Sequence, residues 1–412
     1  MPCDGSIYIS FPHGLKEAVR IAVSGSKSQS NRLLLLRAVA GASFSLENLS
    51  DSDDTRAMAS VLNSTDRVVD IGHAGTAMRF GTAFLAARPG REVTLTGSSR
   101  MKERPIAPLV EALRSLGADI RYGEKEGYPP LEIRGNKLTG GDCSIDSSVS
   151  SQFITALMLV APSFEKGMRL RLEGKSVSRP YIELTASVLR SVGLDCTVGE
   201  KEITVPPGLR TAADRVTVES DWSSASYYFS LAAIDRKKIL VSSYFPHSAQ
   251  GDSRLTEIYR NFGVEARFQG NELLLEPVEG FVAPGHIDLD MENTPDVAQS
   301  VAATMAALQI KGTLTGLGTL RVKETDRIAA LSGELAKFGV GCSSTADTLT
   351  IESFSPRQAD ICLETYQDHR MAMAFAPLAL GGSFAVCDPG VVAKSYPRFW
   401  DDLQTLGLFI TR

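Results

Sequence analysis

The stretch SSASYYFSLAAIDRKKILV (residues 223–241) decides the fold, because its design returns along the whole chain. A polar start leads into a run of small and apolar residues typical of a helix, and a β-type run follows. Segments of this design begin at residues 28, 75, 150, 223, 296 and 369, so the intervals are 47, 75, 73, 73 and 73 residues. Self-similarity at a fixed period indicates a chain built from repeated supersecondary units.

A second piece recurs between these segments. Around Gly117 it reads LVEALRSLGADIRY, an amphipathic helical run followed by a glycine that suits a left-handed C-cap and then by a strand. Equivalent pieces surround Gly193, Gly263 and Gly339, and a returning strand follows each. The first interval is shorter by 73 − 47 = 26 residues, too short for both a full amphipathic helix and a hairpin. The first copy is therefore expected to be truncated.

The fold class predicted from these pieces is α/β. We expect about six βαβαββ repeats, grouped three by three into two domains, with the small-residue helices inside and the sheets outside. This is a two-domain inverse α/β barrel, and a length of 412 residues suits two domains.

Composition excludes several functional classes. The net charge of −5 does not suit general binding to nucleic acid, which rests on many basic contacts to phosphate. The six cysteines are scattered without C-x-x-C or zinc-type spacing, as in a reducing compartment. No secretory signal and no apolar run of about 18 residues is present, so a soluble, cytoplasmic protein without a membrane span is expected.

Cations and hydroxyl groups collect at the starts of the repeated helices and in nearby loops, where helix N-termini favour anions. Each taken alone has a plain explanation: a Ser or Asp at a helix start is usually an N-cap, and Lys323 and Arg327 have the spacing of a solvated ion-pair face. Together they indicate a cleft for a small polyanion, since Arg binds carboxylate and phosphate in a bidentate manner.

The motifs are similar to those of the 5-enolpyruvylshikimate-3-phosphate synthase family. From Ser24 to Trp400 they read, in order, SGSKSQSNRLLLL, AGTAMR, TGSSRMKERPIAPLVEAL, SVSSQFITALM, RVKETDR, YQDHRMAMAF and AKSYPRFW. RMKERP, KETDR and DHRMAM in one chain are a very specific combination.

The resemblance implies two domains, residues 25–219 and residues 1–24 plus 220–412, with the active site in the cleft between them. It implies transfer of the enolpyruvyl group from phosphoenolpyruvate to the 5-hydroxyl of shikimate 3-phosphate. The reaction passes through a tetrahedral intermediate and releases phosphate, without a metal or an organic cofactor. The expected partners are these two substrates alone, and a monomer is expected.

By motif position, the residues implied to bind shikimate 3-phosphate are Lys27, Ser28, Arg32, Ser150, Ser151, Gln152, Ser178, Tyr181, Asp296 and Lys323. Those implied to bind phosphoenolpyruvate are Lys27, Gly75, Arg100, Gln152, Arg327, Arg370 and Lys394. Asp296 is assigned as the base for the 5-hydroxyl and Glu324 as the acid for the methylene carbon, with Lys27 assisting. Which carboxylate performs which proton transfer stays open.

Two positions depart from the family pattern, which usually has Asn where this chain has His73 and Thr319. Gly75 stands where a bulkier residue would crowd glyphosate, a mimic of phosphoenolpyruvate, so sensitivity to glyphosate is expected. Two alternatives stay open. One is the sister transferase that acts on UDP-N-acetylglucosamine, although that family carries a reactive Cys where RMKERP stands here. The other is a repeat protein that binds a phosphorylated metabolite without turnover.

Overall fold

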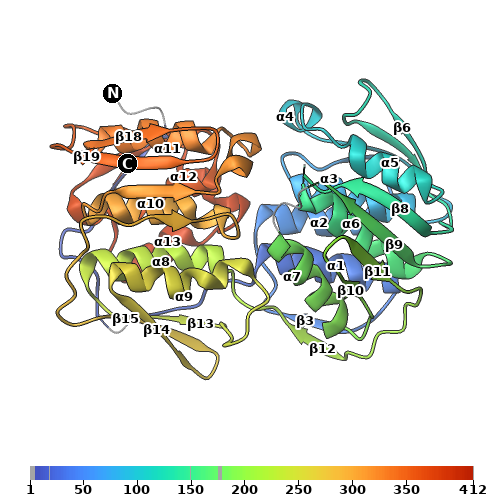
Figure 1. Ribbon diagram of the computed structural model, residues 1–412, viewed down its shortest axis with the longest axis horizontal. Coiled ribbons are helices and arrows are strands. Elements are labelled where there is room, and N and C mark those ends of the chain that lie inside the picture. Colours follow the sequence, from blue (N-terminus) through green and yellow to red (C-terminus); the bar gives the residue numbers. More distant parts are fainter. Residues whose placement is uncertain (1–4, 18, 149, 175–178, 412) are drawn as a thin grey trace. The chain divides into compact units, whose positions relative to one another are not determined.

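The computed structural model describes residues 5–17, 19–148, 150–174 and 179–411 (Figure 1). The chain forms two compact units, which we call the continuous unit (residues 25–218) and the split unit (residues 1–24 with 219–412). The boundary lies one residue before the expected position. Glu219 belongs to the split unit because its carboxylate accepts hydrogen bonds from Trp222, Ser248 and Gln250 of that unit.

Three inner helices contact one another in the continuous unit. They are α1 (Lys27–Ala40), α3 (Gly75–Ala86) and α6 (Ser151–Val160). In α3 and α6 nearly every side chain is small or apolar and buried, which is the pattern of a helix with no solvent-facing side, whereas α1 buries only residues 30–36. In α3 even Thr82 is buried, and its hydroxyl donates to the carbonyl of Met78.

Two four-stranded sheets of this unit share one topology, in which the first pair of strands is parallel and the others are antiparallel. One has the order β4 (Val68–Asp70), β5 (Glu92–Thr96), β7 (Leu131–Arg134) and β6 (Asp119–Tyr122). The other has the order β8 (Gly141–Asp146), β9 (Met168–Glu173), β11 (Glu202–Val205) and β10 (Thr197–Val198).

The first copy is truncated, as the short interval predicted. Its sheet has only the parallel pair β12 (Arg215–Thr217) and β3 (Ser45–Glu47) among the described residues. The amphipathic helix α2 (Asp53–Asn63) remains, so the hairpin is the part that is missing. The other helical elements described in this unit are α4 (Ser99–Lys102), α5 (Ala107–Ser115), η1 (Ala161–Ser163) and α7 (Arg179–Ser191).

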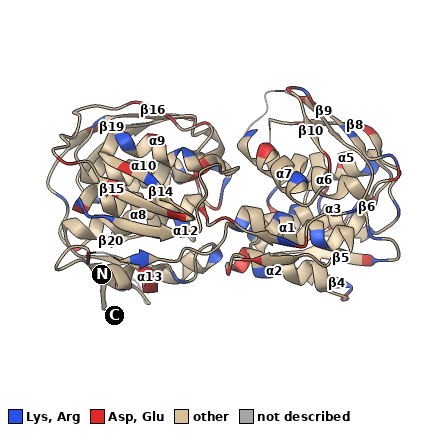
Figure 2. Ribbon diagram, turned by 90° about the horizontal axis from the view of Figure 1, so that it is seen from below, with Lys and Arg blue, Asp and Glu red and all other residues tan. Residues whose placement is uncertain are grey.

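The split unit repeats this architecture around α8 (Trp222–Asp235), α10 (Ala298–Ala307) and α12 (His369–Phe375), which also contact one another. Figure 2 shows most of α8 in tan, because its side chains are apolar or small. The other helices described in this unit are η2 (Gly251–Arg254), α9 (Leu255–Ile258), η3 (Tyr259–Phe262), η4 (Pro295–Val297), η5 (Gly318–Val322), α11 (Arg327–Lys337), η6 (Ala376–Gly381), η7 (Pro389–Lys394) and α13 (Phe399–Leu406).

Two of its sheets are built like those of the continuous unit. Their orders are β2 (Arg20–Ile21), β13 (Ile239–Ser242), β15 (Glu272–Pro277) and β14 (Val264–Gln269), and β16 (Leu289–Asp290), β17 (Gly312–Thr315), β19 (Leu349–Phe354) and β18 (Val340–Ser344).

The third sheet uses a strand from the start of the chain. Its order is β20 (Cys362–Leu363), β21 (Phe384–Val386), β1 (Ile7–Ser10) and β22 (Phe409–Thr411). Strand β1 pairs antiparallel with both β21 and β22, in the position that a hairpin strand has in the other sheets. The first residues of the chain therefore complete the last repeat. No helix of the described residues is long and apolar enough to cross a membrane.

Candidate functional site

The polar network of the split unit centres on Arg327, the first residue of α11. Its guanidinium group is 2% exposed and contacts three carboxylates. Nη1 lies 3.1 Å from Asp296, Nη2 lies 2.9 Å from Glu324, and Nε lies 2.6 Å from Asp368. These residues come from three separate segments of the sequence, so only the fold brings them together.

Local sequence explains why Arg327 starts a helix. Asp326 is the N-cap, and its carboxylate accepts hydrogen bonds from the backbone N–H groups of Ile328 and Ala329, each at 3.2 Å. Such a cap satisfies N–H groups that have no partner inside the helix. The cap fixes the first turn, and with it the direction of the Arg327 side chain.

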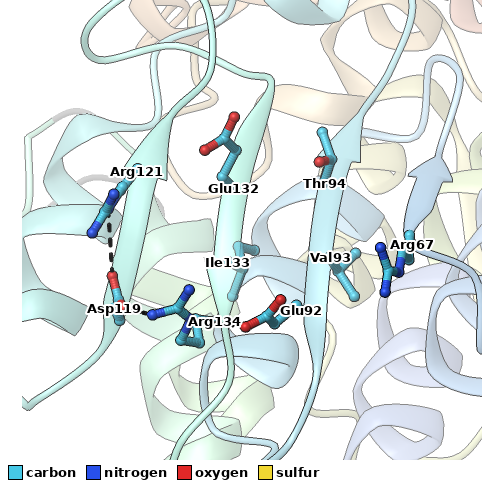
Figure 3. A pocket seen from close by; sticks show the side chains of 9 residues that line it. All are labelled: Arg67, Glu92, Val93, Thr94, Asp119, Arg121, Glu132, Ile133 and Arg134. Carbon is cyan, nitrogen blue, oxygen red and sulfur yellow. Dashed lines mark hydrogen bonds and ion pairs between the residues drawn. The ribbon is translucent and has the colours of Figure 1, made fainter.

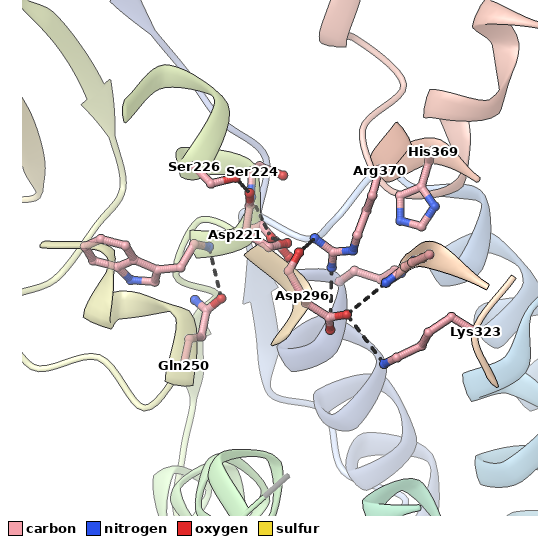
Figure 4. A network of polar contacts seen from close by, with 12 residues as sticks. Asp221, Ser224, Ser226, Gln250, Asp296, Lys323, His369 and Arg370 are labelled. Carbon is pink, nitrogen blue, oxygen red and sulfur yellow. Dashed lines mark hydrogen bonds and ion pairs between the residues drawn. The ribbon is translucent and has the colours of Figure 1, made fainter. Parts of the chain in front are cut away.

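Asp296 contacts two further cations, as Figure 4 shows. Lys323 Nζ lies 3.5 Å from its carboxylate, and Arg370 lies 3.7 Å from it. Arg370 also donates a hydrogen bond of 2.8 Å to the Asp296 carbonyl oxygen. Asp296 lies in η4, which precedes α10, so the expected position at a helix start is correct.

Glu324 is paired with Lys394, 2.5 Å away, as well as with Arg327. Burial alone would raise the pKa of Glu324. The charges of Arg327, Lys394 and His369 outweigh that effect and hold its pKa well below the usual range. Without a ligand, Glu324 is therefore a carboxylate. Lys323, which flanks Glu324 in sequence, contacts Asp296 instead.

The start of α12 holds the remaining part of this network. Asp368 is the N-cap and accepts a hydrogen bond of 2.9 Å from the backbone N–H of Arg370. The His369 ring is 2% exposed, with Nδ1 3.6 Å from Asp368. The network thus combines four cations of the predicted set with carboxylates that hold them in place. An entering phosphate or carboxylate could replace those carboxylates as the partner of the cations.

In the continuous unit, Arg32 is 3% exposed and joins α1 to α7. It donates to Thr185 Oγ1 and to the Ser28 carbonyl oxygen, each at 2.7 Å, and its guanidinium carbon lies 5.8 Å from the centre of the Tyr181 ring. Burial lowers its pKa to about 10, and Tyr181 opposes that effect. Arg32 is therefore still a cation at neutral pH.

Lys27, the first residue of α1, forms an ion pair of 3.2 Å with Asp54, which is buried. Sequence reasoning did not select Asp54. Its signal was the N-cap Ser52 followed by two aspartates in the first turn of α2. We therefore add Asp54 to the candidate site residues of the continuous unit, as the ion-pair partner of Lys27.

Gly75 begins α3 beside two arginines. A Cβ atom placed on Gly75 would lie 2.7 Å from Arg104 Nη1 and 3.1 Å from Arg79 Nη1. Arg79 is buried and donates to the Gly75 carbonyl oxygen at 3.1 Å. Glycine is thus the residue that leaves room for these two guanidinium groups.

Ser150 caps α6 and accepts a hydrogen bond of 3.3 Å from the Gln152 backbone N–H, and Ser151 is buried in the first turn. Arg100 lies on α4, where it is exposed and forms an ion pair of 2.9 Å with Glu103. The structure does not bring Arg100 onto any other predicted site residue that it describes. Ser178 lies outside the described residues.

The two departures from the family pattern have different surroundings. His73 Nδ1 lies 3.0 Å from Ser98 Oγ, at the N-cap of α4. The Thr319 hydroxyl oxygen is buried and has no hydrogen-bond partner among the described residues.

Two other features contain none of the predicted site residues. Cys362, Glu364 and Cys387 place their donor atoms within 4.8 Å of one another, because β20 and β21 run in parallel. A pocket on the sheet β4–β5–β7–β6 is lined by charged side chains of β5, β7 and β6 and by Arg67, which precedes β4 (Figure 3). Its ion pairs, such as Arg134 with Glu92 at 3.0 Å, are exposed and contribute little to the free energy of unfolding.

The comparisons with known proteins cover almost the whole chain. The family model described as EPSP synthase (3-phosphoshikimate 1-carboxyvinyltransferase) matches residues 61–403. A 3-phosphoshikimate 1-carboxyvinyltransferase from Bacteroides fragilis is 40% identical over 407 residues, which is 98% of each chain. One from Vibrio atlanticus is 38% identical over 424 residues, covering 95% of this chain and 98% of the relative.

Solved structures show the same fold. The structure of EPSP synthase from Acinetobacter baumannii has a TM-score of 0.78 at 22% identity and covers 99% of this chain and 100% of that one. The enolpyruvyl transferase NikO from Streptomyces tendae has a TM-score of 0.74 at 16% identity and covers 98% of each chain. These likenesses confirm the predicted fold class, and the sequence matches confirm the predicted family. The chain belongs to the EPSP synthase (3-phosphoshikimate 1-carboxyvinyltransferase) family.

Proposed function

We propose that this chain transfers the enolpyruvyl group of phosphoenolpyruvate to the 5-hydroxyl of shikimate 3-phosphate and releases inorganic phosphate. Membership of the family supports this activity. The observation that carries the residue roles is the network around Arg327, where six residues selected from the sequence gather in one unit. They are Asp296, Lys323, Glu324, Arg327, Arg370 and Lys394.

Phosphoenolpyruvate is proposed to bind to Arg327, Arg370 and Lys394 of the split unit. The two guanidinium groups suit bidentate pairing with its carboxylate and phosphate, and Lys394 adds a point charge. Each of these cations is paired with a carboxylate of the protein. Binding therefore exchanges a protein anion for a substrate anion instead of desolvating an isolated charge. Lys27, Gly75, Arg100 and Gln152 of the continuous unit complete this set in the proposal.

Shikimate 3-phosphate is proposed to bind to Asp296 and Lys323 of the split unit and to a larger set in the continuous unit. Hydroxyl groups at the start of α6 and the buried cation Arg32 suit its phosphate. The members of that set are Lys27, Ser28, Arg32, Ser150, Ser151, Gln152, Ser178 and Tyr181. The proposal requires both units to bind the same pair of substrates.

The chemistry follows from the charges of two carboxylates. Asp296 accepts the 5-hydroxyl proton as the hydroxyl oxygen attacks C2 of phosphoenolpyruvate, while Glu324 supplies a proton to C3. Glu324 needs that proton first. When substrate anions take over Arg327 and Lys394, the charges that lower the pKa of Glu324 are neutralised, and its pKa rises toward that of a buried acid.

The elimination step reverses these roles. Glu324 accepts a proton from C3, the C–O bond to phosphate breaks as Asp296 returns its proton to the departing phosphate, and the enolpyruvyl double bond forms again. Fixed cations stabilise the charge that develops on the leaving phosphate. No metal or organic cofactor enters the proposed reaction.

A coupled phosphate-release assay tests the function. Purified protein is given phosphoenolpyruvate with either shikimate 3-phosphate or UDP-N-acetylglucosamine. We expect release only with shikimate 3-phosphate. Release only with the nucleotide sugar would establish the sister activity, and binding without release would establish a non-catalytic binding protein.

Two finer expectations accompany this proposal. We expect a single chain of 44.3 kDa in solution, which light scattering measures. We also expect a cytoplasmic location, which cell fractionation measures.

A further inference from the structure

Asp252 is a carboxyl group that the sequence motifs do not single out. It lies in the first turn of η2 and is half-buried. Its side chain has no hydrogen bond or ion pair within the part of the chain that the structure describes. A carboxyl group with no partner of its own is unusual in a unit where the other buried carboxylates are paired.

The segment before Asp252 is fixed to the start of α8. Gln250 Oε1 accepts a hydrogen bond of 3.2 Å from the Trp222 backbone N–H, as Figure 4 shows. Gln250 Nε2 donates to Glu219 Oε2 at 3.0 Å and to the Ser220 carbonyl oxygen at 2.9 Å. Three hydrogen bonds of one buried amide thus hold this segment against α8.

The same end of α8 lies beside the site. Helix α8 contacts both η2, which carries Asp252, and η4, which carries Asp296. Asp221 is the N-cap of α8. The charged groups that act on Asp252 are the carboxylates Asp296 and Asp221 and the cations Arg370 and Lys323. Asp252 and the polar network described above therefore lie near the same helix, and their charges act on each other.

In these surroundings the carboxyl group of Asp252 binds a proton near neutral pH. Burial contributes most to raising its pKa to about 7, Asp296 and Asp221 add to this, and Arg370 and Lys323 oppose it. A further anion brought next to the group must raise its affinity for a proton, because like charge disfavours the ionised form.

We propose that Asp252 is a positioning residue of this site, which takes up a proton when the anionic substrate enters. Uptake removes a negative charge that acts on Asp296 and Lys323, so that Lys323, which is proposed to bind shikimate 3-phosphate, faces the substrate and not a further carboxylate. The inference rests on the proposed function, because it takes shikimate 3-phosphate as the entering anion.

Proton uptake can be measured directly. Shikimate 3-phosphate alone, which gives no turnover, is titrated into the full-length protein at pH 7 in buffers of different ionisation enthalpy, and calorimetry gives the protons bound per ligand. A group with a pKa of about 7 can take up at most about half a proton at pH 7. We expect wild type to take up about 0.2–0.5 proton more than Asp252→Asn. Equal proton counts would overturn the inference.

A second readout follows from the sign of the charge. Above pH 7 an ionised Asp252 repels the substrate, so the Kd of shikimate 3-phosphate should rise severalfold more in wild type than in Asp252→Asn between pH 6.5 and 8.5. The substrate's own titration is common to both proteins and cancels in this comparison. The same pH dependence in both would contradict the inference. If Asp252→Asn does not fold, Asp252→Ser takes its place.

Asp142→Asn is the matched control, since the Asp142 side chain is 81% exposed in the continuous unit. It should behave like wild type in both experiments, and a loss of uptake there would count against a specific role of Asp252. The phosphate-release assay separates the two proposals. Wild type that releases phosphate but shows no Asp252-dependent proton uptake refutes this inference alone, whereas wild type that releases none refutes the proposed function.

Discussion

Arg327 holds three carboxylates with one guanidinium group, and its surroundings make that arrangement costly to break. Removing one partner of a buried ion pair leaves charges without compensation, which costs about 3–5 kcal/mol. Single residues of this kind connect stability to function, because the same cation is proposed to bind phosphoenolpyruvate.

We expect Arg327→Met to lower the free energy of unfolding by about 3–5 kcal/mol at pH 7, measured by urea denaturation. The folded-state pKa of Glu324 lies below its ordinary value of 4.5. The ion pairs of Glu324 therefore contribute stability above pH 4.5, and this contribution is lost as the pH falls through the lower folded-state value. The difference between wild type and variant should accordingly be constant above pH 4.5 and shrink as the pH falls below 4.5.

Arg321→Met is the control for this experiment, because Arg321 is exposed and lies 3.8 Å from Asp326. Its effect should stay within about 0.5 kcal/mol. A loss in Arg327→Met that does not depend on pH would show that packing, and not charge, accounts for the effect.

At Gly75, a larger side chain would crowd two arginine side chains of the candidate site. In Gly75→Ala the new Cβ would lie 2.7 Å from Arg104 Nη1, so that guanidinium group must move. We expect wild type to be inhibited by glyphosate. In the variant the KM for phosphoenolpyruvate should rise about tenfold, as for an overpacking cost of about 1–1.5 kcal/mol, and inhibition should weaken.

Phosphate-release kinetics with and without glyphosate test this prediction. Gly285→Ala is the matched control, since a Cβ there meets nothing within 4 Å. Unimpaired wild-type turnover at millimolar glyphosate, or an unchanged KM in Gly75→Ala, would be incompatible with the role given to Gly75.

At the residue scale, sequence could select the cations but not all of their partners. Lys323, Arg327 and Arg370 stand in recognisable motifs at helix starts. Asp54 and Asp252 stand in none of the family motifs. The ion-pair partner of Asp54 and the charges that act on Asp252 lie 27 residues or more away along the chain. Which charges face one another depends on tertiary packing, which local patterns do not report.

At the scale of elements, β1 has the position that shows most clearly how the repeats are completed. It lies between β21 and β22, so the last sheet depends on residues from the start of the chain. Within it, Ile9 is 1% exposed and faces the core, whereas Tyr8 is 41% exposed on the opposite face. Because buried and exposed side chains alternate along β1, the loss of stability on substitution should differ between neighbouring residues.

We expect Ile9→Ala to cost about 2–5 kcal/mol of unfolding free energy, as for a buried aliphatic side chain cut to Ala. Tyr8→Ala in the same strand should cost less than about 1 kcal/mol. Urea denaturation measures both. Equal effects would mean that β1 is not held in this sheet.

The repeats show what periodicity can predict. The 47-residue interval indicated a truncated first copy, and the structure places the truncation at the hairpin while α2 remains. The pairing of β1 with β21 and β22 could not be derived from the period, because almost the whole chain separates β1 from those strands in sequence. Spacing reports neighbours in sequence, and strand pairing between the ends depends on closing a very long loop.

At the scale of the whole molecule, the chain forms two units, the described residues form three sheets in each, and each unit carries part of the predicted set. Arg32, Lys27 and Gly75 belong to the continuous unit, and the Arg327 network belongs to the split unit. The central claim is that the cations of the split unit bind phosphoenolpyruvate. It requires a substitution there to act on one substrate and spare the other.

Steady-state kinetics of Arg370→Ala, with each substrate varied in turn, test that claim most directly. We expect the KM for phosphoenolpyruvate to rise at least tenfold, because a charge-assisted contact of about 1.5–3 kcal/mol is lost, and the KM for shikimate 3-phosphate to change less than about twofold. Arg357→Ala is the matched control, since Arg357 donates to the carbonyl oxygens of Gly382 and Ser383 and should leave both values unchanged. An equal rise of both KM values in Arg370→Ala would contradict the account.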